Sequence, residues 1–164
     1  MKIAVYPGTF DPVTNGHMDI LQRAIAIFDI VIIAVAVDNY KNALFSLEER
    51  LSLLQEVAKG LPNVEVDTFN GLLVEYCANK NATAIVRGLR AVSDFEYELQ
   101  IALMNKKLNE NLETIFLMTA AENSFVSSTI IKQVSALGGC IEGLVPSFVA
   151  KKLREKYKTI QNCT

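Results

Sequence analysis

No hydrophobic run in the sequence is long enough to cross a lipid bilayer. The longest apolar segment, Ile30–Val37, has eight residues, whereas a membrane-spanning helix needs about 20. The chain begins with Met1–Tyr6 and passes directly into the turn-forming Pro7-Gly8-Thr9, so we expect no secretory signal peptide, which needs an apolar stretch and a small-residue cleavage site. These absences favour a cytoplasmic protein that has no membrane partner.

Cysteine and histidine are scarce. The three cysteines, Cys77, Cys140 and Cys163, lie far apart, and His17 is the only histidine. Because there is no CxxC pair and no Cys/His cluster, the sequence argues against a zinc site and a disulfide framework and favours reduced thiols. It names no metal ligands of any other kind.

The glycine patterns of common nucleotide-binding loops are absent too. No two glycines stand two positions apart, which excludes the GxGxxG motif. The one pair that stands five apart, Gly138 and Gly143, is followed by Leu144 instead of lysine. A standard dinucleotide-binding fold or a P-loop is therefore not expected.

An excess of positive charge is missing as well. The chain has 16 lysines and arginines against 18 aspartates and glutamates, and five of the basic residues crowd between Lys151 and Lys158. The rest of the chain therefore holds 11 basic and 17 acidic residues, a balance unsuited to a broad phosphate footprint on DNA or RNA. We expect no nucleic-acid partner, although a few well-placed cations could bind a small anionic ligand.

What the sequence does contain is a regular alternation of strand and helix patterns. Its 164 residues, 51% of them hydrophobic, favour a single domain over 1–164, of which 146–164 are a C-terminal helix and tail. Ile30–Val37 is β-branched and apolar on both faces, as in a parallel strand covered on each side by helices. The expected strands are Lys2–Tyr6, Ile30–Val37, Val64–Phe69, Ala82–Val86 and Thr114–Met118.

Helix signals separate these strands. Apolar residues between Met18 and Phe28 recur at helical spacing, and capping-box patterns at Ser46–Glu49 and Ser93–Glu96 predict two further helix starts. Helices are also expected over 72–79, 128–137 and 147–158. The alternation predicts an α/β fold, a single doubly wound domain with a five-stranded parallel sheet and helices on both faces.

Candidate site residues follow the carboxyl ends of the predicted strands, where an open parallel sheet binds its ligands. The connection Pro7–His17 exceeds the ~2–6 residues usual for a strand-to-helix loop. The polar residues after the other strands are Lys41, Arg87, Arg90, Ser124, Ser127-Ser128-Thr129 and Lys132. Together with the unpaired N–H groups of helix starts they predict a phosphate-binding surface, so a phosphate ester is the expected ligand.

These residues also have simpler interpretations. An isolated histidine such as His17 is more often a capping or surface residue, and one hydroxyl of Ser127–Thr129 would serve as a helix cap. Lys41 alone would be an ordinary solvated lysine. We favour a functional role because His17 stands at a predicted helix start near several cations, where a donor to a phosphate or a departing oxyanion is well placed.

Two motifs are similar to those of the nucleotidylyltransferase superfamily: a TxGH motif at Thr14–His17 and a Ser/Thr-rich motif at Val126–Lys132. Within that superfamily, residues 2–150 closely resemble the bacterial phosphopantetheine adenylyltransferases. The segments that carry the resemblance are Tyr6–Pro12, Thr14–His17, Phe45–Arg50 and, most specifically, Arg87–Glu98. The resemblance implies a Rossmann-like nucleotidylyltransferase fold.

The resemblance also implies an activity, the penultimate step of coenzyme A biosynthesis. In that step the adenylyl group of ATP passes to 4′-phosphopantetheine, which gives dephospho-CoA and pyrophosphate. Mg²⁺ as a cofactor, a homohexamer built as a dimer of trimers, and CoA as a feedback ligand are implied as well. Because one phosphate attacks another, positioning and charge neutralisation matter more than an enzyme nucleophile, and direct in-line attack is expected.

Site residues are carried over position by position from the same resemblance. Catalytic roles fall to His17, as donor to the α-phosphate, to Lys41, as a clamp on the acceptor phosphate with Arg87, and to Arg90, as a partner of the β- and γ-phosphates with Ser128 and Thr129. The residues expected to bind ATP are Thr9, Phe10, His17, Gly88, Leu89, Arg90, Glu98, Asn123, Ser124, Phe125, Val126, Ser127, Ser128 and Thr129. The residues expected to bind the acceptor are Thr9, Lys41, Leu73, Arg87, Met104 and Asn105. Asn123 departs from the family, which commonly has an aromatic residue there.

Two alternatives compete with this activity. The first is a related transferase that uses CTP or nicotinamide mononucleotide; the Arg87–Glu98 segment and the absence of an Arg-Thr-x-Gly-Ile-Ser-Thr-Thr motif argue against it. The second is a catalytically silent sensor of nucleotides or CoA. The presence of His17, Lys41 and Arg87 argues against a sensor, because binding alone would not need all three.

Overall fold

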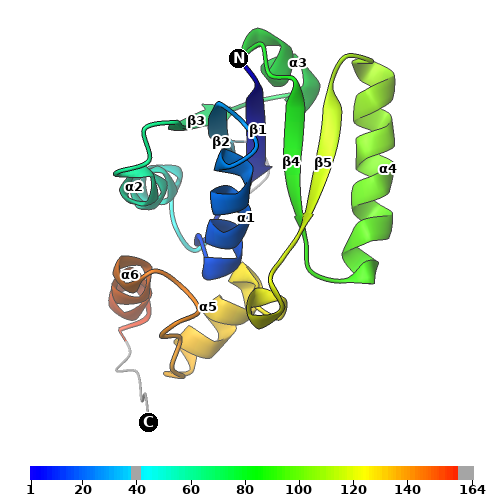
Figure 1. Ribbon diagram of the computed structural model, residues 1–164. Coiled ribbons are helices and arrows are strands. Elements are labelled where there is room, and N and C mark those ends of the chain that lie inside the picture. The colour runs from blue at the N-terminus through cyan, green and yellow to red at the C-terminus, as the bar shows by residue number, and fades with distance from the viewer. Residues whose placement is uncertain (38–41, 159–164) are drawn as a thin grey trace.

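The computed structural model describes residues 1–37 and 42–158, so Lys41 lies outside the described part of the chain. Five parallel strands form one sheet in the order β3-β2-β1-β4-β5 (Figure 1). The strands are β1 (Ile3–Gly8), β2 (Ile30–Ala36), β3 (Val64–Phe69), β4 (Ala84–Leu89) and β5 (Glu113–Met118). The predicted doubly wound α/β fold is confirmed.

Helices cover both faces of this sheet (Figure 1). They are α1 (Asn15–Ile25), α2 (Leu47–Ala58), α3 (Leu73–Asn79), α4 (Val92–Leu108), α5 (Ser128–Ala136) and α6 (Ser147–Tyr157), with a 3-10 helix, η1, at Ala121–Asn123. Helices α1, α2, α5 and α6 share one hydrophobic core with the sheet, while α3 packs in a second core on the opposite face. Helix α4 lies along β4 and β5 and contacts α3.

The unbroken apolar run of β2 follows from this layering. Val31, Ile33 and Val35 belong to the first core, whereas Ile32 and Ala34, which alternate with them, belong to the second. Both faces of the strand are therefore buried, and no position from 31 to 35 can hold a polar side chain without loss of packing.

Strand β4 runs further than the sequence predicts. Its pairing with β5 continues as far as Leu89, which lies opposite Met118, so Arg87 is a strand residue instead of a loop residue. Gly88 makes this possible, because a Cβ atom there would lie 2.9 Å from Cγ1 of Ile20 on α1. From the sequence alone, an Arg-Gly pair predicts the end of a strand. The strand continues through it here because α1 packs against β4.

The two predicted capping boxes have different outcomes. At the start of α2 the prediction is confirmed: the Glu49 N–H donates to Ser46 Oγ at 3.2 Å, and the Ser46 N–H donates to Glu49 Oε2 at 2.8 Å. Helix α4 instead begins at Val92, with Ala91 as N-cap and without a side-chain hydrogen bond from that residue. The capping-box motif at Ser93 is therefore wrong as the helix start, since the helix has already begun there.

Cys77 is a free thiol, fully buried in α3, and burial raises its pKa to about 12, so it behaves as a small apolar residue. The expectation of reduced thiols is therefore confirmed at Cys77, while Cys163 lies outside the described residues. Among the described helices, none combines the length and apolar character needed to span a bilayer.

Candidate active site

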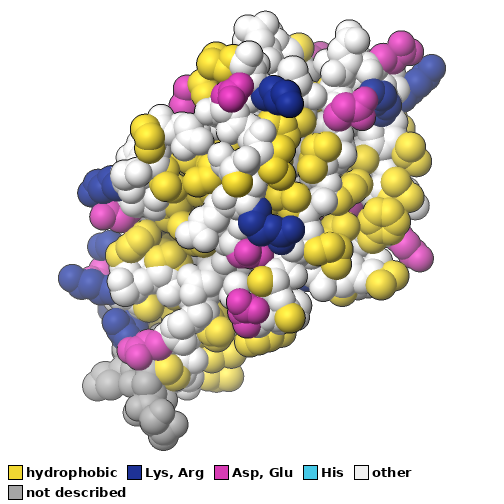
Figure 2. Space-filling view, viewed as in Figure 1, with side chains coloured by type: hydrophobic (Ala, Val, Ile, Leu, Met, Phe, Trp, Pro, Cys, Tyr) yellow, Lys and Arg dark blue, Asp and Glu magenta, His cyan; other side chains and the backbone are white. Residues whose placement is uncertain are grey.

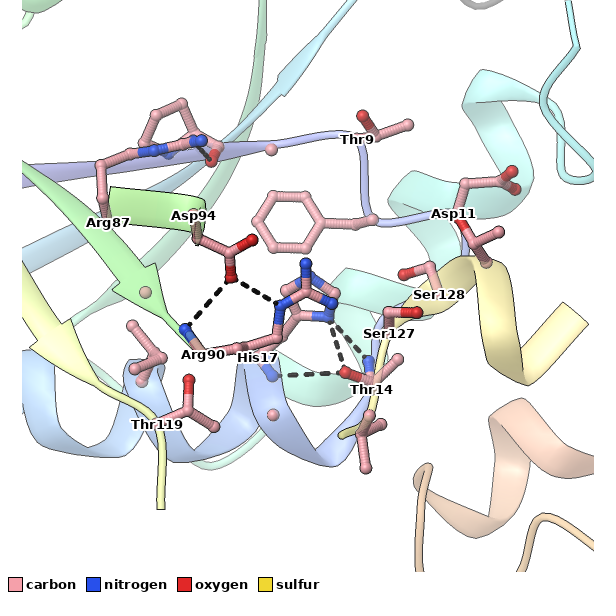
Figure 3. Close-up of a pocket in the computed structure, with 18 of the residues that line it drawn as sticks. Thr9, Asp11, Thr14, His17, Arg87, Arg90, Asp94, Thr119, Ser127 and Ser128 are labelled. Carbon is pink, nitrogen blue, oxygen red and sulfur yellow. Dashed lines mark hydrogen bonds and ion pairs between the residues drawn. The ribbon is translucent and has the colours of Figure 1, made fainter. Parts of the chain in front are cut away.

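A cavity of about 810 Å³ opens beyond the carboxyl ends of β1 and β4 (Figure 3). Its walls come from the loop after β1, the first turn of α1, the end of β4, the start of α4 and the first turn of α5, with Asn42 and Ala43 on a further side. This is the position that an open parallel sheet offers to a ligand. The long first loop and the helix starts converge there as predicted.

His17 is held at the start of α1 by a capping box. Thr14 is the N-cap: its Oγ1 accepts the His17 backbone N–H at 3.4 Å, and the Thr14 backbone N–H donates to His17 Nδ1 at 3.0 Å. Because Nδ1 accepts this bond, the proton of the neutral imidazole is placed on Nε2. His17 is therefore both the capping residue of the simpler interpretation and a donor in the cavity wall.

The imidazole of His17 is neutral near pH 7. Burial, and then the positive charges of Arg90 and Arg87, lower its pKa from 6.5 to about 4. A ring this hard to protonate keeps one N–H and offers it to a ligand without carrying a charge of its own. The ring of Phe10, 5.0 Å away between centroids, restricts the imidazole on another side.

The loop after β1 has an unusual backbone where it passes the cavity. Phe10 has a φ of 50° and is 2% exposed, and a Cβ atom on Gly8 would lie 2.9 Å from the Phe10 ring. A non-glycine residue in the left-handed region stores strain that only a well-packed site maintains. The glycine at position 8 is thus required by the close approach of this ring.

Arg87 is fixed by an ion pair that crosses from β4 to α4. Its Nε donates to Glu98 Oε2 at 2.7 Å, its Nη2 pairs with Glu98 Oε1, and its Nη1 donates to the Pro7 carbonyl at 3.0 Å. A bidentate pair of this kind locks the guanidinium plane. Glu98, which the resemblance assigns to ATP, is therefore a direct partner of an arginine assigned to the acceptor.

Arg90 is held more loosely. Its backbone N–H lies 3.3 Å and its Nε 3.4 Å from Asp94 Oδ2, one turn along the chain (Figure 3). The Arg90 side chain is 41% exposed, against 30% for Arg87. Both arginines border the cavity, but only Arg87 has a rigid bidentate partner.

Two hydroxyls at the start of α5 have protein partners. Ser127 is the N-cap and its Oγ accepts the Ile130 N–H at 3.2 Å, as one residue of this run was expected to do. Ser128 Oγ donates to the Pro12 carbonyl of the first loop at 2.8 Å. Thr129 also lines the cavity. The helix start therefore presents N–H groups and hydroxyl oxygens to the same space as His17.

Comparison with known proteins identifies the family. A sequence model described as cytidylyltransferase-like matches residues 5–134. The phosphopantetheine adenylyltransferases of Moorella thermoacetica and Carboxydothermus hydrogenoformans are 61% and 58% identical to the chain, each over 96% of this chain and 98% of the relative. That of Clostridium kluyveri is 52% identical over 99% of this chain and 100% of the relative. This chain belongs to the phosphopantetheine adenylyltransferase family.

A solved structure extends the likeness to the fold. A protein from Vibrio parahaemolyticus described as a nicotinate-nucleotide adenylyltransferase superposes with a TM-score of 0.70, over 98% of this chain and 99% of that chain, at 18% identity. At such low identity the likeness concerns the fold alone. The chain therefore shares its architecture with that protein. The high-identity relatives favour the phosphopantetheine adenylyltransferase activity over the CTP or nicotinamide alternative.

The structure brings most of the predicted site residues of this adenylyltransferase together. Those on the wall of the large cavity are Thr9, Phe10, His17, Arg87, Gly88, Arg90, Glu98, Val126, Ser127, Ser128 and Thr129. A smaller cavity of about 180 Å³ shares Arg87 and Glu98 and adds Leu73 and Asn105. Lys41 lies outside the described residues. The predicted residues that line neither of these two cavities are Leu89, Met104, Asn123, Ser124 and Phe125.

Two charged residues of the cavity wall were given no individual role from the sequence: Lys132 was only included in the predicted phosphate-binding surface, and Asp11 was not singled out. Lys132 Nζ lies 2.7 Å from Asp11 Oδ2, and both side chains border the large cavity. The spacing supports a place for Lys132 in the site, because it follows Ser128 by four residues and so shares its helix face. Asp11 had no comparable signal, since an aspartate in a Pro- and Gly-rich loop usually makes a turn.

Proposed function

We propose that the large cavity transfers the adenylyl group of ATP directly to the phosphate of 4′-phosphopantetheine, which forms dephospho-CoA and pyrophosphate. The observation that carries the proposal is a neutral imidazole N–H in one cavity with two arginines and the start of α5. In-line attack is expected because the site contributes donors and cations, while none of the described side chains stands out as a nucleophile.

His17 is assigned to the α-phosphate. The transition state spreads negative charge over the oxygens of the transferred group, and a fixed donor aimed at that charge stabilises it more than it stabilises bound ATP. The Nε2–H of a neutral imidazole provides this hydrogen bond without releasing a proton. The hydrogen bond from Thr14 to Nδ1 keeps the ring in the tautomer that donates.

Arg87 and Lys41 are assigned to the acceptor phosphate. The attacking phosphate is an anion that must approach a second anion, so its charge has to be offset and its oxygen directed. The ion pair with Glu98 and the bond to Pro7 support this role because they fix the orientation of the guanidinium. Lys41, three residues before Leu44 in the sequence, is proposed as the second clamp.

Arg90, Ser128 and Thr129 are assigned to the β- and γ-phosphates. These groups leave as pyrophosphate, and their growing charge needs a cation that can follow it. Arg90 suits this role because its contact with Asp94 is long and its side chain is partly exposed. The N-terminus of α5 adds backbone N–H groups with a favourable dipole.

Mg²⁺ is proposed as the cofactor, bound mainly through the phosphates of ATP. Among the described residues there is no group of three His, Cys, Asp or Glu side chains that could hold a metal ion. The three carboxylates on the cavity wall, Asp11, Asp94 and Glu98, each pair with a cation. This fits Mg²⁺, which keeps several waters and binds through substrate phosphates, where it offsets their charge.

The pantetheine arm is assigned to the smaller cavity. Leu73, Ile101 and Ala102 provide an apolar lining there, and Asn105 adds an amide able to bond an amide of the arm. Arg87 lies on both cavities, so a ligand whose phosphate meets Arg87 can extend its arm into the smaller one. CoA carries the same arm, which supports its proposed role as a feedback ligand.

A homohexamer, a dimer of trimers located in the cytoplasm, is proposed from the family and from the surface of α4. Large apolar side chains of this helix are exposed, including Val92, Tyr97, Leu103 and Met104, and Figure 2 shows apolar side chains along that edge of the molecule. A monomer rarely exposes such a patch. Leu103→Glu should lower the mass measured by light scattering; an unchanged mass would argue against α4 as a subunit contact.

Turnover decides between the transferase and the silent sensor. The purified chain is incubated with ATP, Mg²⁺ and 4′-phosphopantetheine, and the release of pyrophosphate is followed together with dephospho-CoA. The proposal expects pyrophosphate and dephospho-CoA in equal amounts. It expects no product when CTP replaces ATP or when nicotinamide mononucleotide replaces 4′-phosphopantetheine. Binding of ATP and 4′-phosphopantetheine without product would identify a sensor.

A further inference from the structure

Asp11 is a buried carboxylate in the cavity wall that the reaction scheme above does not use. It is 3% exposed and accepts three hydrogen bonds: from Leu44 N to Oδ2 at 3.0 Å, from Phe45 N to Oδ1 at 2.9 Å, and from Lys132 Nζ to Oδ2 at 2.7 Å. A buried charge is costly unless its hydrogen bonds are satisfied. These partners come from two distant parts of the chain, and both parts contact Asp11.

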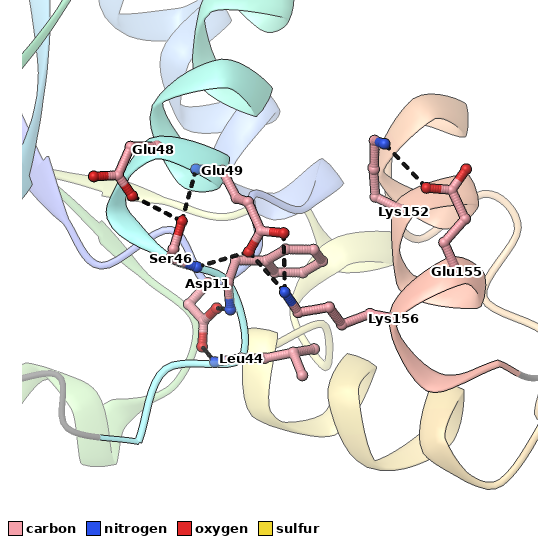
Figure 4. A network of polar contacts seen from close by, with 9 residues as sticks. Asp11, Leu44, Ser46, Glu48, Glu49, Lys152, Glu155 and Lys156 are labelled. Atoms are coloured by element: carbon pink, nitrogen blue, oxygen red, sulfur yellow. Dashed lines mark hydrogen bonds and ion pairs between the residues drawn. The ribbon is translucent and has the colours of Figure 1, made fainter.

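The partners Leu44 and Phe45 belong to the wall segment, defined here as residues 42–46, which enters α2. Its N–H groups at positions 44, 45 and 46 all donate to carboxylates, the first two to Asp11 and the third to Glu49. On the other side, Lys156 of α6 binds Glu49 at 2.8 Å and lies 5.5 Å from the centre of the Phe45 ring (Figure 4). The wall segment is thus held from both sides.

Lys132 brings the opposite wall to the same carboxylate. It lies on α5, one turn after Ser128, and borders the cavity together with Asn42 and Ala43 of the wall segment. Burial alone would raise the pKa of Asp11, but the hydrogen bonds from Lys132, Phe45 and Leu44 lower it below its ordinary value. Asp11 is therefore ionised at neutral pH and can hold an ammonium group and two backbone amides together.

We propose that Asp11 is a positioning residue for adenylyl transfer, whose carboxylate fixes the wall segment and the Lys132 ammonium relative to each other across the cavity. The inference rests on the proposed function, since it concerns the geometry in which the two phosphates meet. Asp11 acts through its partners and does not touch the reacting atoms. Misplacement of a reacting group by about 1 Å can lower the rate ~10²-fold. Loss of the Asp11 contacts should therefore lower kcat more than it weakens ATP binding.

Asp67 provides a matched control for the removal of a carboxylate charge. It lies on β3 and also accepts three hydrogen bonds, from Thr68 N at 2.8 Å, Tyr76 OH at 2.9 Å and Lys80 Nζ at 2.6 Å. It borders neither of the two cavities. Asp11→Asn and Asp67→Asn each leave one donor without its charged partner, but only the first change lies at the cavity.

The test compares both variants with the unmodified chain in pyrophosphate release, ATP binding and amide hydrogen exchange. Asp11→Asn should lower kcat ~10–100-fold, change the Kd for ATP less than about threefold, and speed exchange at Leu44 and Phe45. Asp67→Asn should leave kcat within about twofold even where it lowers Tm. A normal kcat in Asp11→Asn, or equal losses of kcat in both variants, would overturn the positioning role.

Lys132→Met extends the test in case Asp11→Asn fails to fold. Methionine keeps an unbranched side chain, one atom shorter than that of lysine, and removes the charge, so kcat should fall by a similar factor; an unchanged kcat would contradict the proposal. In a Lys132→Met background, Asp11→Asn should have a smaller effect than alone, because the two residues act as a unit. Lack of turnover by the unmodified chain would instead overturn the proposed reaction, which separates the two failures.

Discussion

Helices α1 and α2 on one side of the sheet and α4 on the other bury very different amounts of apolar surface. On one side, Ile20 of α1 and Leu54 of α2 are 1% exposed. On the other, none of the described residues of α4 is buried, and Leu103 is 62% exposed. The side of α1 is completed within the chain, whereas the side of α4 retains apolar surface of the kind that a second copy covers.

This difference separates two kinds of site residue. His17 begins α1 and rests on the complete core, which suits a donor that must be in place before the reaction. Asp94 and Glu98 belong to α4 and hold Arg90 and Arg87. Chemistry at the α-phosphate should therefore depend on the fold of one chain. Binding of the β- and γ-phosphates should depend on α4, which contact with a second copy would stabilise.

The largest effect is expected at His17. His17→Ala removes the neutral donor to the α-phosphate, so turnover should fall by ~10²–10³ while the Kd for ATP changes little. Steady-state pyrophosphate release and calorimetric titration with ATP measure the two quantities. If turnover stays unchanged, the donor role is wrong and His17 is only the capping residue of α1.

The two sides of the sheet should differ in stability when one leucine is truncated. Leu54→Ala opens a cavity in the first core and should lower the free energy of unfolding by about 2–5 kcal/mol. Leu103→Ala, measured on dissociated subunits, should change it by no more than about 0.5 kcal/mol. Urea denaturation monitored by circular dichroism gives both values, and equal losses would show that α4 is as well packed as α2.

Lys41 tests the assignment of cations to the acceptor. Lys41→Ala should raise the KM for 4′-phosphopantetheine about tenfold or more, the cost of one charge-assisted hydrogen bond, and should alter the KM for ATP much less. Initial rates at varied concentrations of each substrate separate the two constants. A similar rise in both would contradict a clamp specific to the acceptor.

The smallest effect is a loss of stability in mild acid. The folded-state pKa of His17, about 4, lies below its ordinary value of 6.5, so the unfolded chain binds more protons between these values and the free energy of unfolding falls as the pH drops through that window. We expect the unmodified chain to lose at most ~1.4 kcal/mol for each pH unit within this window. His17→Gln lacks this group, so an identical pH dependence of urea denaturation in both would refute the shift.

The fold could be predicted from the sequence because its signals are local and repeated. The apolar run of β2 is a pattern of consecutive residues, and the capping box at Ser46 spans only four residues. The end of β4 could not be placed in this way, since Arg87 and Gly88 continue the strand only because α1 packs against it. The helix start near Ser93 was misplaced for a similar reason.

Site residues could be predicted where they belong to a recognisable motif, as His17 does, and where helical spacing puts them on one helix face. Contacts could not be predicted where the partner is remote: the pairing of Arg87 with Glu98 requires β4 and α4 to be adjacent, and the three donors to Asp11 come from segments more than 30 positions away. Such contacts depend on which strands and helices are adjacent in the fold. The sequence pattern predicts the fold class but not these individual contacts.

The stereochemical course at the α-phosphorus tests the central claim most directly. The chain is supplied with ATP that carries a chiral α-phosphorothioate, together with Mg²⁺ and 4′-phosphopantetheine, and the configuration of the dephospho-CoA product is determined. Direct attack of the acceptor in one cavity predicts inversion at phosphorus. Retention would require an adenylyl group carried on the protein, and it would contradict direct transfer between the two substrates.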